Sequence, residues 1–127
     1  MSKLTVAVCT YNRADRLPDL IKELRKQTCS IPFEILIVDN NSSDNTQQIL
    51  SKQATVEGVP LRFVKESQQG IVPARNRAIT EAGKSTYLFF MDDDELPFPG
   101  LLESAVDALA NEGADCVGGK VVNHFST

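Results

Sequence analysis

The chain has 127 residues, a length that fits one domain and can bury a hydrophobic core without disulfides or a structural metal. Hydrophobic residues make up 42% and charged residues 24% of the sequence, as in ordinary soluble globular proteins. The formal net charge is -4 and there is no basic stripe, so the sequence argues against a nucleic-acid-binding protein.

Cysteine usage and the amino terminus bear on the compartment. Cys9, Cys29 and Cys116 are widely spaced and form no C-x-x-C pair, which argues against a zinc site or a disulfide framework and for a reducing compartment. Cys9 and Cys116 lie in apolar runs and are expected to be small buried hydrophobes. There is no signal peptide, and the apolar runs are too short to cross a bilayer. We therefore expect a cytoplasmic protein with no membrane segment in this chain; association of a full-length parent with the inner face of a membrane stays open.

Short apolar runs alternate with amphipathic segments in the first half of the chain. Strands are predicted over residues 4–9 and 33–38, which are apolar and β-branched, and a shorter strand over 61–64. A helix follows the first strand, with Pro18 near its first turn and apolar residues on one face. A second helix includes residues 47–50 and is expected to reach residue 53.

The same alternation continues in the second half. Gly70 opens a third predicted helix, and the fourth strand covers residues 87–91. A fourth, amphipathic helix starts after Pro97 and Pro99, and a fifth strand, weakened by two glycines, is predicted over 114–122. The inward-facing residues are expected to be Ala74, Ala78, Ile79 and Ala82 in the third helix, and Leu101, Leu102, Ala105, Val106 and Leu109 in the fourth.

This order of elements predicts an α/β fold with three layers. Strands that alternate with helices imply right-handed crossovers and a mostly parallel sheet covered by helices on both faces. Ligands of such sheets bind beyond the carboxyl ends of the strands. The loops after the first, second and fourth strands, residues 10–13, 39–44 and 92–95, are therefore expected to line one edge of the sheet.

Three aspartates, Asp92, Asp93 and Asp94, follow the fourth strand directly. Side chains alternate near a strand end, so Asp92 and Asp94 can face the same way and offer hard oxygen ligands to Mg²⁺ or Mn²⁺. A cation there would neutralise a diphosphate leaving group. The alternative is a solvated loop whose carboxylates cap the next helix, but the position at the expected binding edge favours the metal site. Glu95 can help to hold the metal loop, but a cap or surface role is the favoured expectation.

Other candidate residues lie near the same edge. Asp39 ends the second strand, where it can accept hydrogen bonds from a base or a ribose, or belong to a turn. Residues 41–44 are expected to form a turn and a helix cap. Thr10 and Tyr11 can offer backbone groups and a stacking ring to a base, or Tyr11 can pack as a partly buried aromatic. Arg75, near a helix amino terminus, can bind an anion or pair with a surface carboxylate.

Four segments, taken together, resemble a known family. They are the run VAVCTYNR from Val6, the run IVDNNSSD from Ile37, Gly70 followed by Ala74-Arg75-Asn76, and the run FMDDD from Phe90. Each is weakly specific alone, but the ordered set resembles the inverting family-2 glycosyltransferases of the GT-A fold. The resemblance covers nearly the whole chain, from residue 4 to about residue 122.

The resemblance implies a Rossmann-like GT-A domain that binds a nucleoside-diphosphate sugar, with a UDP-sugar as the expected donor and Mn²⁺ or Mg²⁺ as the cofactor. Asp92 and Asp94 match the D-x-D motif of the family, with Asp93 in the variable middle position. Asp94 would hold the metal, and Asp92 would contact the ribose or the metal. Arg75 would lie near Asp39 or the diphosphate. The expected nucleotide-binding residues are Thr10, Tyr11, Asn12, Arg13, Asp39, Asn41, Arg75, Asp92 and Asp93.

In this family the acceptor site and a carboxylate general base lie in the second half of the domain, and no such segment follows Thr127. We therefore expect residues 1–127 to be the nucleotide-sugar-binding portion of a domain cut before its acceptor part. Such a portion would bind the donor but transfer sugar poorly or not at all. The acceptor can be a glycan, a lipid or a protein, and a homodimer through surface that the missing half would cover stays open.

Two other functions compete with sugar transfer. A nucleotidyltransferase shares the sheet and the metal-binding carboxylates, but it should carry a glycine-rich basic loop after the first strand, and residues 10–13 contain no glycine. A Rossmann dehydrogenase is excluded by the missing G-x-G-x-x-G run. A non-catalytic nucleotide-binding module with the same fold remains the other alternative.

Overall fold

The computed structural model describes residues 4–112, and in that range strands and helices alternate as the sequence predicts. The predicted strand over 114–122 lies outside the described residues, and so does the side chain of Leu109. No helix within residues 4–112 is long and apolar enough to cross a membrane. The elements are β1 (Leu4–Thr10), α1 (Leu17–Arg25), β2 (Phe33–Asp39), α2 (Thr46–Gln53), β3 (Leu61–Lys65), α3 (Ile71–Glu81), β4 (Tyr87–Asp92) and α4 (Leu101–Glu112).

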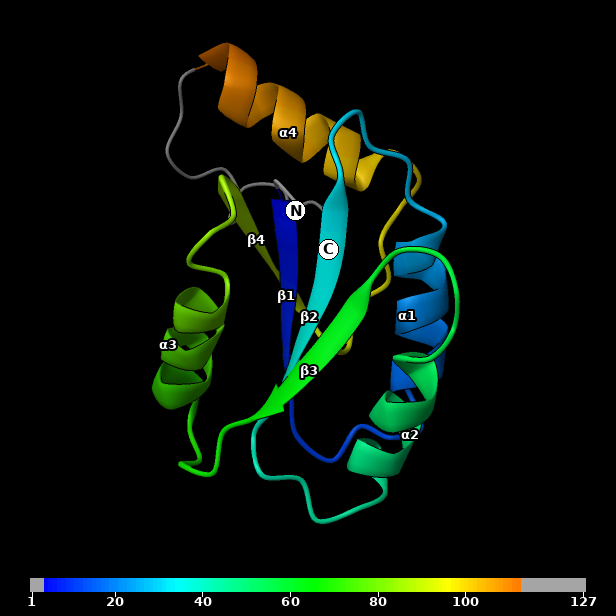
Figure 1. The fold of residues 1–127 in the computed structure, drawn as a ribbon, viewed down its shortest axis with the longest axis vertical. Coiled ribbons are helices and arrows are strands. Elements are labelled where there is room, and N and C mark those ends of the chain that lie inside the picture. Colours follow the sequence, from blue (N-terminus) through cyan, green and yellow to red (C-terminus); the bar gives the residue numbers. More distant parts are fainter. Residues whose placement is uncertain (1–3, 113–127) are drawn as a thin grey trace.

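The four described strands form one sheet in the order β3-β2-β1-β4, and every neighbouring pair is parallel. The register brings the strand ends level, because Thr10 of β1 pairs with Asp39 of β2, and Cys9 pairs with Asp92 of β4. The carboxyl ends of the strands therefore meet at one edge, which lies at the bottom of Figure 1. The predicted parallel sheet is confirmed.

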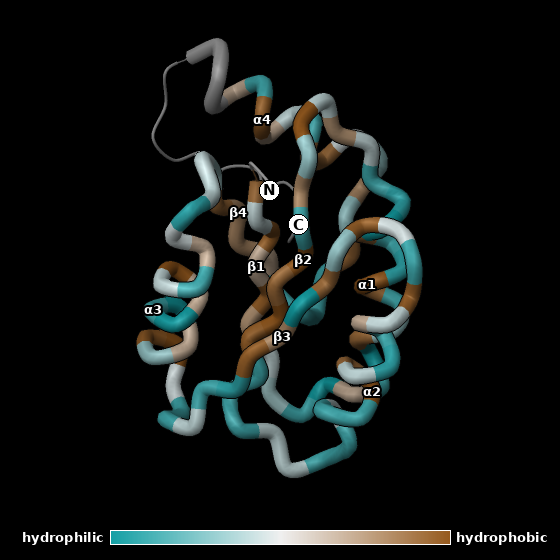
Figure 2. The backbone as a smooth tube through the Cα atoms, viewed as in Figure 1, coloured by the Kyte–Doolittle hydropathy of each residue, from teal (hydrophilic) through white to brown (hydrophobic). Residues whose placement is uncertain are grey.

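Helices cover both faces of the sheet, so the fold has three layers (Figure 1). Alternate residues of β1 supply the two cores: Val6 and Val8 pack with α1, α2 and α4, whereas Ala7 packs with α3. The first core is the larger one and contains leucine and isoleucine side chains, while α3 presents small alanines to the second. Figure 2 shows the hydrophobic residues concentrated along the strands and the hydrophilic ones on the loops at the lower edge.

One inward-facing residue of the third helix is predicted wrongly. Ala74, Ala78 and Ala82 are buried, but Ile79 is 54% exposed. The three alanines are spaced by four residues and lie on one face of α3, whereas Ile79 is rotated by about 100° from Ala78. The apolar character of Ile79 therefore does not report its position. In α4, the predicted burial of Leu101, Leu102, Ala105 and Val106 is confirmed.

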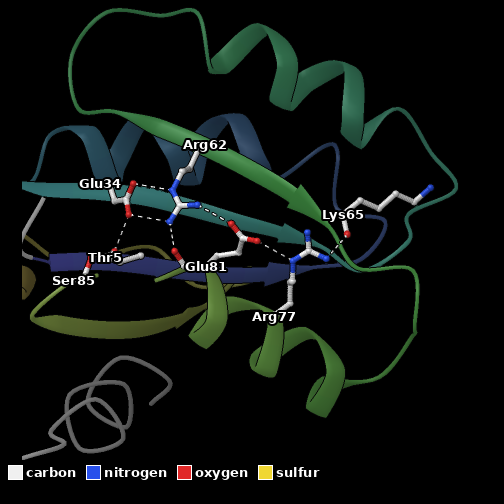
Figure 3. A network of polar contacts seen from close by, with 7 residues as sticks. All are labelled: Thr5, Glu34, Arg62, Lys65, Arg77, Glu81 and Ser85. Carbon is white, nitrogen blue, oxygen red and sulfur yellow. Dashed lines mark hydrogen bonds and ion pairs between the residues drawn. The ribbon is translucent and has the colours of Figure 1, made fainter. Parts of the chain in front are cut away.

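A network of charged side chains fixes α3 against the sheet (Figure 3). Arg62 of β3 donates from Nε to Glu34 Oε1 at 2.9 Å, and from Nη1 to Glu81 Oε1 at 3.0 Å. Its Nη2 donates to the backbone carbonyl of Glu81 at 2.6 Å, at the last residue of the helix. Arg77 also donates to Glu81, and Thr5 donates to Glu34. This network holds the carboxyl end of α3 in place. It thereby sets the direction of the helix, whose amino-terminal end lies at the carboxyl edge of the sheet.

Candidate functional site

A cavity of about 580 Å³ lies at the carboxyl edge of the sheet. It is enclosed by the loop after β1, the loop after β4, the end of β2 and the first turns of α3, so segments far apart in the sequence meet there. The expectation that the loops after the first, second and fourth strands share one edge is confirmed. The lining residues are Cys9, Thr10, Tyr11, Arg13, Asn40, Gln69, Gly70, Ile71, Ala74, Arg75, Phe90, Met91, Asp92, Asp93 and Asp94.

The acidic loop brings three carboxylates together at this cavity. Asp92, Asp94 and Glu95 each offer an oxygen, and these oxygens lie within 4.8 Å of one another. Asp92 and Asp94 are exposed, whereas both carboxylate oxygens of Glu95 are buried without a hydrogen-bond donor among the described residues. The cap or surface role expected for Glu95 is wrong, because α4 begins only at Leu101 and the carboxylate turns toward the two aspartates.

The environment of Glu95 fits a cation. Burial raises the pKa of Glu95 above its ordinary value, and the nearby Asp92 and Asp94 carboxylates raise it further. A buried carboxylate without a donor is unfavourable unless it takes up a proton or contacts a cation. Three carboxylates form a hard oxygen donor set of the kind that Mg²⁺ and Mn²⁺ prefer. The residues present therefore suit a divalent ion.

Asp93, the middle residue of the acidic run, turns toward β1 and is not one of the three clustered carboxylates. Its Oδ2 accepts a hydrogen bond from Thr10 Oγ1 at 2.9 Å and lies 3.8 Å from Arg13 Nε. Burial raises the pKa of Asp93, and the Thr10 hydrogen bond and the Arg13 charge oppose this rise only in part. The alternation of side chains expected at the strand end thus separates Asp93 from its two neighbours.

Arg75 is a further residue of the cavity lining. Its guanidinium lies over the ring of Phe90 in β4, 5.3 Å from the ring centroid, which is within the range of cation–π contacts. Across residues 4–112 it forms no ion pair, so the alternative of a surface carboxylate partner is not found there. Arg75 and Arg13 supply the positive charge of the cavity lining, beside the acidic loop.

Asp39 lies near the cavity but is not one of its lining residues. It is fully buried, and its Oδ1 accepts a hydrogen bond from the Ser42 amide at 3.1 Å, while its Oδ2 accepts one from Gln47 Nε2. None of the hydrogen bonds described for Asp39 within residues 4–112 involves Arg75. Each oxygen of the carboxylate keeps a further lone pair that can accept a hydrogen bond.

Asn12 and Asn41 also lie outside the cavity lining. Asn12 Oδ1 accepts hydrogen bonds from the amides of Ser43 at 2.8 Å and Asp44 at 3.3 Å, so this side chain joins the loop after β1 to the loop after β2. Asn41 has a φ of 68°, in the left-handed region that asparagine tolerates. Asp44 accepts a hydrogen bond from the Thr46 amide at 3.1 Å, so the expected turn is confirmed, whereas the N-cap residue of α2, Asn45, makes no side-chain cap.

Asn40 is a buried residue of the cavity that the sequence analysis did not single out. Its Nδ2 donates to the carbonyls of Glu66 at 3.1 Å and Gln68 at 2.9 Å, and its Oδ1 accepts from the Gly70 amide at 3.0 Å. These bonds tie the end of β2 to the segment that leads into α3. The sequence signal that could have identified Asn40 is its place in the loop after a buried strand. The other residues of that loop share this signal, so it does not single out Asn40.

Cys9 also lines the cavity and is half-buried, less so than its apolar surroundings predict. Burial raises the pKa of the Cys9 thiol to about 11, although the Arg75 charge lowers it in part. The thiol is therefore neutral near pH 7 and is a poor nucleophile there, since thiolates are the reactive form. Sulfur chemistry is not what this site is arranged to perform.

Comparison with known proteins shows which family the sequence matches. The model of the family described as "Glycosyl transferase family 2" matches residues 5–127, which is almost the whole chain. The chain is 32% identical over 119 residues to glycosyltransferase AglE of Haloferax volcanii, a match that covers 93% of this chain and 39% of AglE.

Solved structures show the same fold. The mannosyltransferase PcManGT of Pyrobaculum calidifontis, in complex with GDP-Man and Mn²⁺, superposes with a TM-score of 0.76 and 30% identity, over 86% of this chain and 32% of that one. S. aureus TarS 1-349 in complex with UDP-GlcNAc superposes with a TM-score of 0.72 and 28% identity, over 89% of this chain and 32% of that one. The chain thus spans about two fifths or less of the length of these proteins.

Proposed function

The chain belongs to glycosyl transferase family 2, and we propose that it forms the donor-binding part of an enzyme that transfers sugar from a nucleoside-diphosphate sugar. The observation that carries the proposal is one cavity whose lining includes Asp92 and Asp94 together with Arg75. A diphosphate carries negative charge on both phosphates and is best bound between a cation and a guanidinium. Both can be supplied here.

The proposed donor lies across the carboxyl ends of β1 and β4. The base would stack near Tyr11, whose ring is 47% exposed, and contact the loop that begins at Thr10. The diphosphate would lie between Arg75 and the acidic loop. In this orientation the nucleotide contacts residues of the cavity lining, whereas Asp39, Asn12 and Asn41 lie outside the lining and shape the loops.

Asp92, Asp94 and Glu95 are the residues proposed to hold a divalent cation, with Mn²⁺ or Mg²⁺ as the candidates. When bound, such an ion would neutralise charge on the departing nucleoside diphosphate. Asp92 and Asp94 are exposed and can reach both the ion and ribose or phosphate groups, whereas Glu95 would bind from beneath. The Mn²⁺ in the complex of PcManGT, which shares the fold of this chain, supports a metal at this site.

We propose a UDP-sugar as the donor, in line with the UDP-GlcNAc bound to TarS. Because PcManGT holds GDP-Man, guanine nucleotides are the first competitor to test. Transfer is proposed to invert the anomeric centre: an acceptor hydroxyl attacks the anomeric carbon, the bond to the diphosphate breaks, and a carboxylate takes the hydroxyl proton. We expect that carboxylate and the acceptor site outside residues 1–127.

The experiment is a set of calorimetric titrations and thermal melts of the chain with UDP, GDP and NAD, each with and without Mn²⁺. We expect UDP to bind most tightly and to raise the melting temperature more in the presence of Mn²⁺. Asp94→Asn, which keeps the size of the side chain, should remove the Mn²⁺-dependent part. Asp15→Ala is the matched control, because Asp15 is an exposed carboxylate in the loop after β1 and does not line the cavity.

Two results would contradict the proposal. One is equal binding of NAD and UDP, and the other is no binding of any nucleotide by a chain that is folded by circular dichroism. Sugar transfer is tested on a longer form that includes an acceptor part: loss of UDP-sugar turnover in Asp94→Asn with retained folding separates an enzyme from a non-catalytic nucleotide-binding module.

A further inference from the structure

The Asp93 carboxylate joins the two loops that border the cavity. It belongs to the loop after β4, but its Oδ2 accepts the Thr10 hydroxyl at 2.9 Å and lies 3.8 Å from Arg13 Nε, both on the side of β1. Only 17% of the Asp93 side chain is exposed and Thr10 is buried, so their hydrogen bond is shielded from water, whereas the Arg13 side chain is 46% exposed. The contact is therefore part of the cavity wall.

The neighbouring residues show what this contact positions. Thr10 and Asp92 are the last residues of β1 and β4, and these two strands pair directly. Asp93 lies between Asp92 and Asp94, and its carboxylate binds Thr10. This contact fixes the spacing of the two loops. It also sets which way the chain turns after Asp92, and so the direction in which Asp92 and Asp94 point.

We propose that Asp93 is a positioning residue for donor binding: it holds the loop at Thr10 and Arg13 in register with the acidic loop, so that the base and the diphosphate of one nucleotide are bound together. The proposal rests on the proposed function and adds a positioning role for a lining residue that lies outside the carboxylate cluster. Asp93 Oδ2 is occupied by Thr10, and Asp93 is absent from the carboxylate cluster of Asp92, Asp94 and Glu95.

The first experiment compares UDP affinity in the presence of Mn²⁺ for the wild-type chain, Asp93→Ala and Asp93→Asn. Asp93→Ala should lose about tenfold in affinity, as expected for a hydrogen bond to a charged group whose loss lets a binding loop shift. Asp93→Asn should regain most of this loss, because its Oδ1 can accept the Thr10 hydroxyl from the same place. Asp15→Ala serves as the control: it also removes one carboxylate, but from an exposed residue in the loop after β1 for which no side-chain partner is described within residues 4–112.

The second experiment tests the coupling itself. Thr10→Val removes the hydroxyl that donates to Asp93 and keeps the shape of the side chain. If the two residues act through this hydrogen bond, Asp93→Ala should cost little further affinity in a Thr10→Val background, so the double-mutant cycle in UDP binding is strongly non-additive. Mn²⁺ alone, titrated by electron paramagnetic resonance, should bind Asp93→Ala within about threefold of wild type, since Asp93 lies outside the cluster.

Three outcomes would overturn the inference. Unchanged UDP affinity in Asp93→Ala would mean that the contact does not position the donor. Equal losses in Asp93→Ala and Asp93→Asn would mean that the negative charge itself binds the cation or shapes the field. Additive losses in the cycle would sever the link to Thr10. If the wild-type chain itself binds no nucleotide, the proposed function fails first, which separates the two failures.

Discussion

Replacement of Asn40 by alanine tests how the cavity is built. Asn40 is 9% exposed, and its amide makes three hydrogen bonds to the backbone of the segment that leads into α3. A net intramolecular hydrogen bond contributes about 1 kcal/mol, and the three acting on one segment sum to about 3 kcal/mol. Gln68 and Gly70 are exposed, so water can replace part of what is lost, and we expect Asn40→Ala to lower the free energy of unfolding by about 1.5–2.5 kcal/mol.

The same substitution should weaken nucleotide binding. Gly70 precedes the first turn of α3, which carries Arg75 into the cavity, and its φ of 131° is accessible to glycine but strained for other residues. Without the Asn40 bonds this segment samples other conformations, and the apparent affinity falls with the fraction of molecules in which the cavity is formed. A fall of about three- to tenfold in UDP affinity follows if that fraction drops to about 10–30%.

Urea unfolding at pH 7 gives the stability change, and titration calorimetry with UDP and Mn²⁺ gives the affinity. Asn45→Ala is the matched control, because Asn45 is exposed and makes no side-chain cap to α2, so its loss should stay within about 0.5 kcal/mol. Asn40→Asp keeps an acceptor for Gly70 but loses both donors, and should be at least as unstable as Asn40→Ala. Wild-type stability and affinity in Asn40→Ala would refute the reasoning.

Three further changes probe the cavity and the α3 network. Arg75→Ala should weaken UDP binding about tenfold by calorimetry, and Arg75→Lys nearly as much, because an ammonium cannot stack on Phe90 while it reaches a phosphate. Burial raises the pKa of Glu34, but hydrogen bonds from Arg62 and Thr5 outweigh it and leave the pKa below its ordinary value of 4.5. The ionised Glu34 carboxylate therefore stabilises the fold above about pH 4.5, and this stabilisation is lost on further acidification. In urea unfolding, Glu34→Gln should show a shallower loss of stability between about pH 5 and 3 than wild type. Glu95→Gln should have opposite effects in two thermal melts: without metal it relieves carboxylate repulsion and raises or preserves the melting temperature, and with Mn²⁺ and UDP it loses much of the metal-dependent increase. A Glu95→Gln variant that melts lower without metal and binds Mn²⁺ like wild type would show that the carboxylate has a purely structural role.

The elements of the fold could be predicted because their signals are local. The strands are short apolar runs, the helices carry apolar faces, and the order of the two fixes a parallel sheet through the handedness of the crossovers. Ile79 shows the limit of local signals. Its apolar side chain predicts a core position, but α3 packs on the sheet through alanines. The sequence of the helix alone does not show how closely the helix packs on the sheet. Such errors arise where tertiary packing decides the face.

The sequence predicts which residues lie at the carboxyl edge of the sheet, but it does not predict which of them line the cavity. Thr10, Asp92 and Arg75 reach the lining as expected from their elements, while Asp39 turns inward and satisfies its oxygens with Ser42 and Gln47. Asn, Asp and Ser at strand ends bind ligands, cap helices and brace neighbouring loops with the same atoms. Sequence position alone cannot distinguish these uses, because they differ only in which donor lies within hydrogen-bond distance in the folded protein.

The side chains that join these loops determine how this edge of the sheet can be altered. Asn12 joins the first loop to the second, Asn40 joins the second to the segment before α3, and Asp93 joins the last loop to the first. Each loop that borders the cavity is thus held by a polar side chain from another loop, and the cavity can keep its shape before a nucleotide arrives. Preorganisation of this kind lowers the ordering cost of binding. A donor preference should therefore be changed most safely at lining residues that brace nothing, such as Tyr11 and Ile71, because a substitution at a bracing residue alters two loops at once.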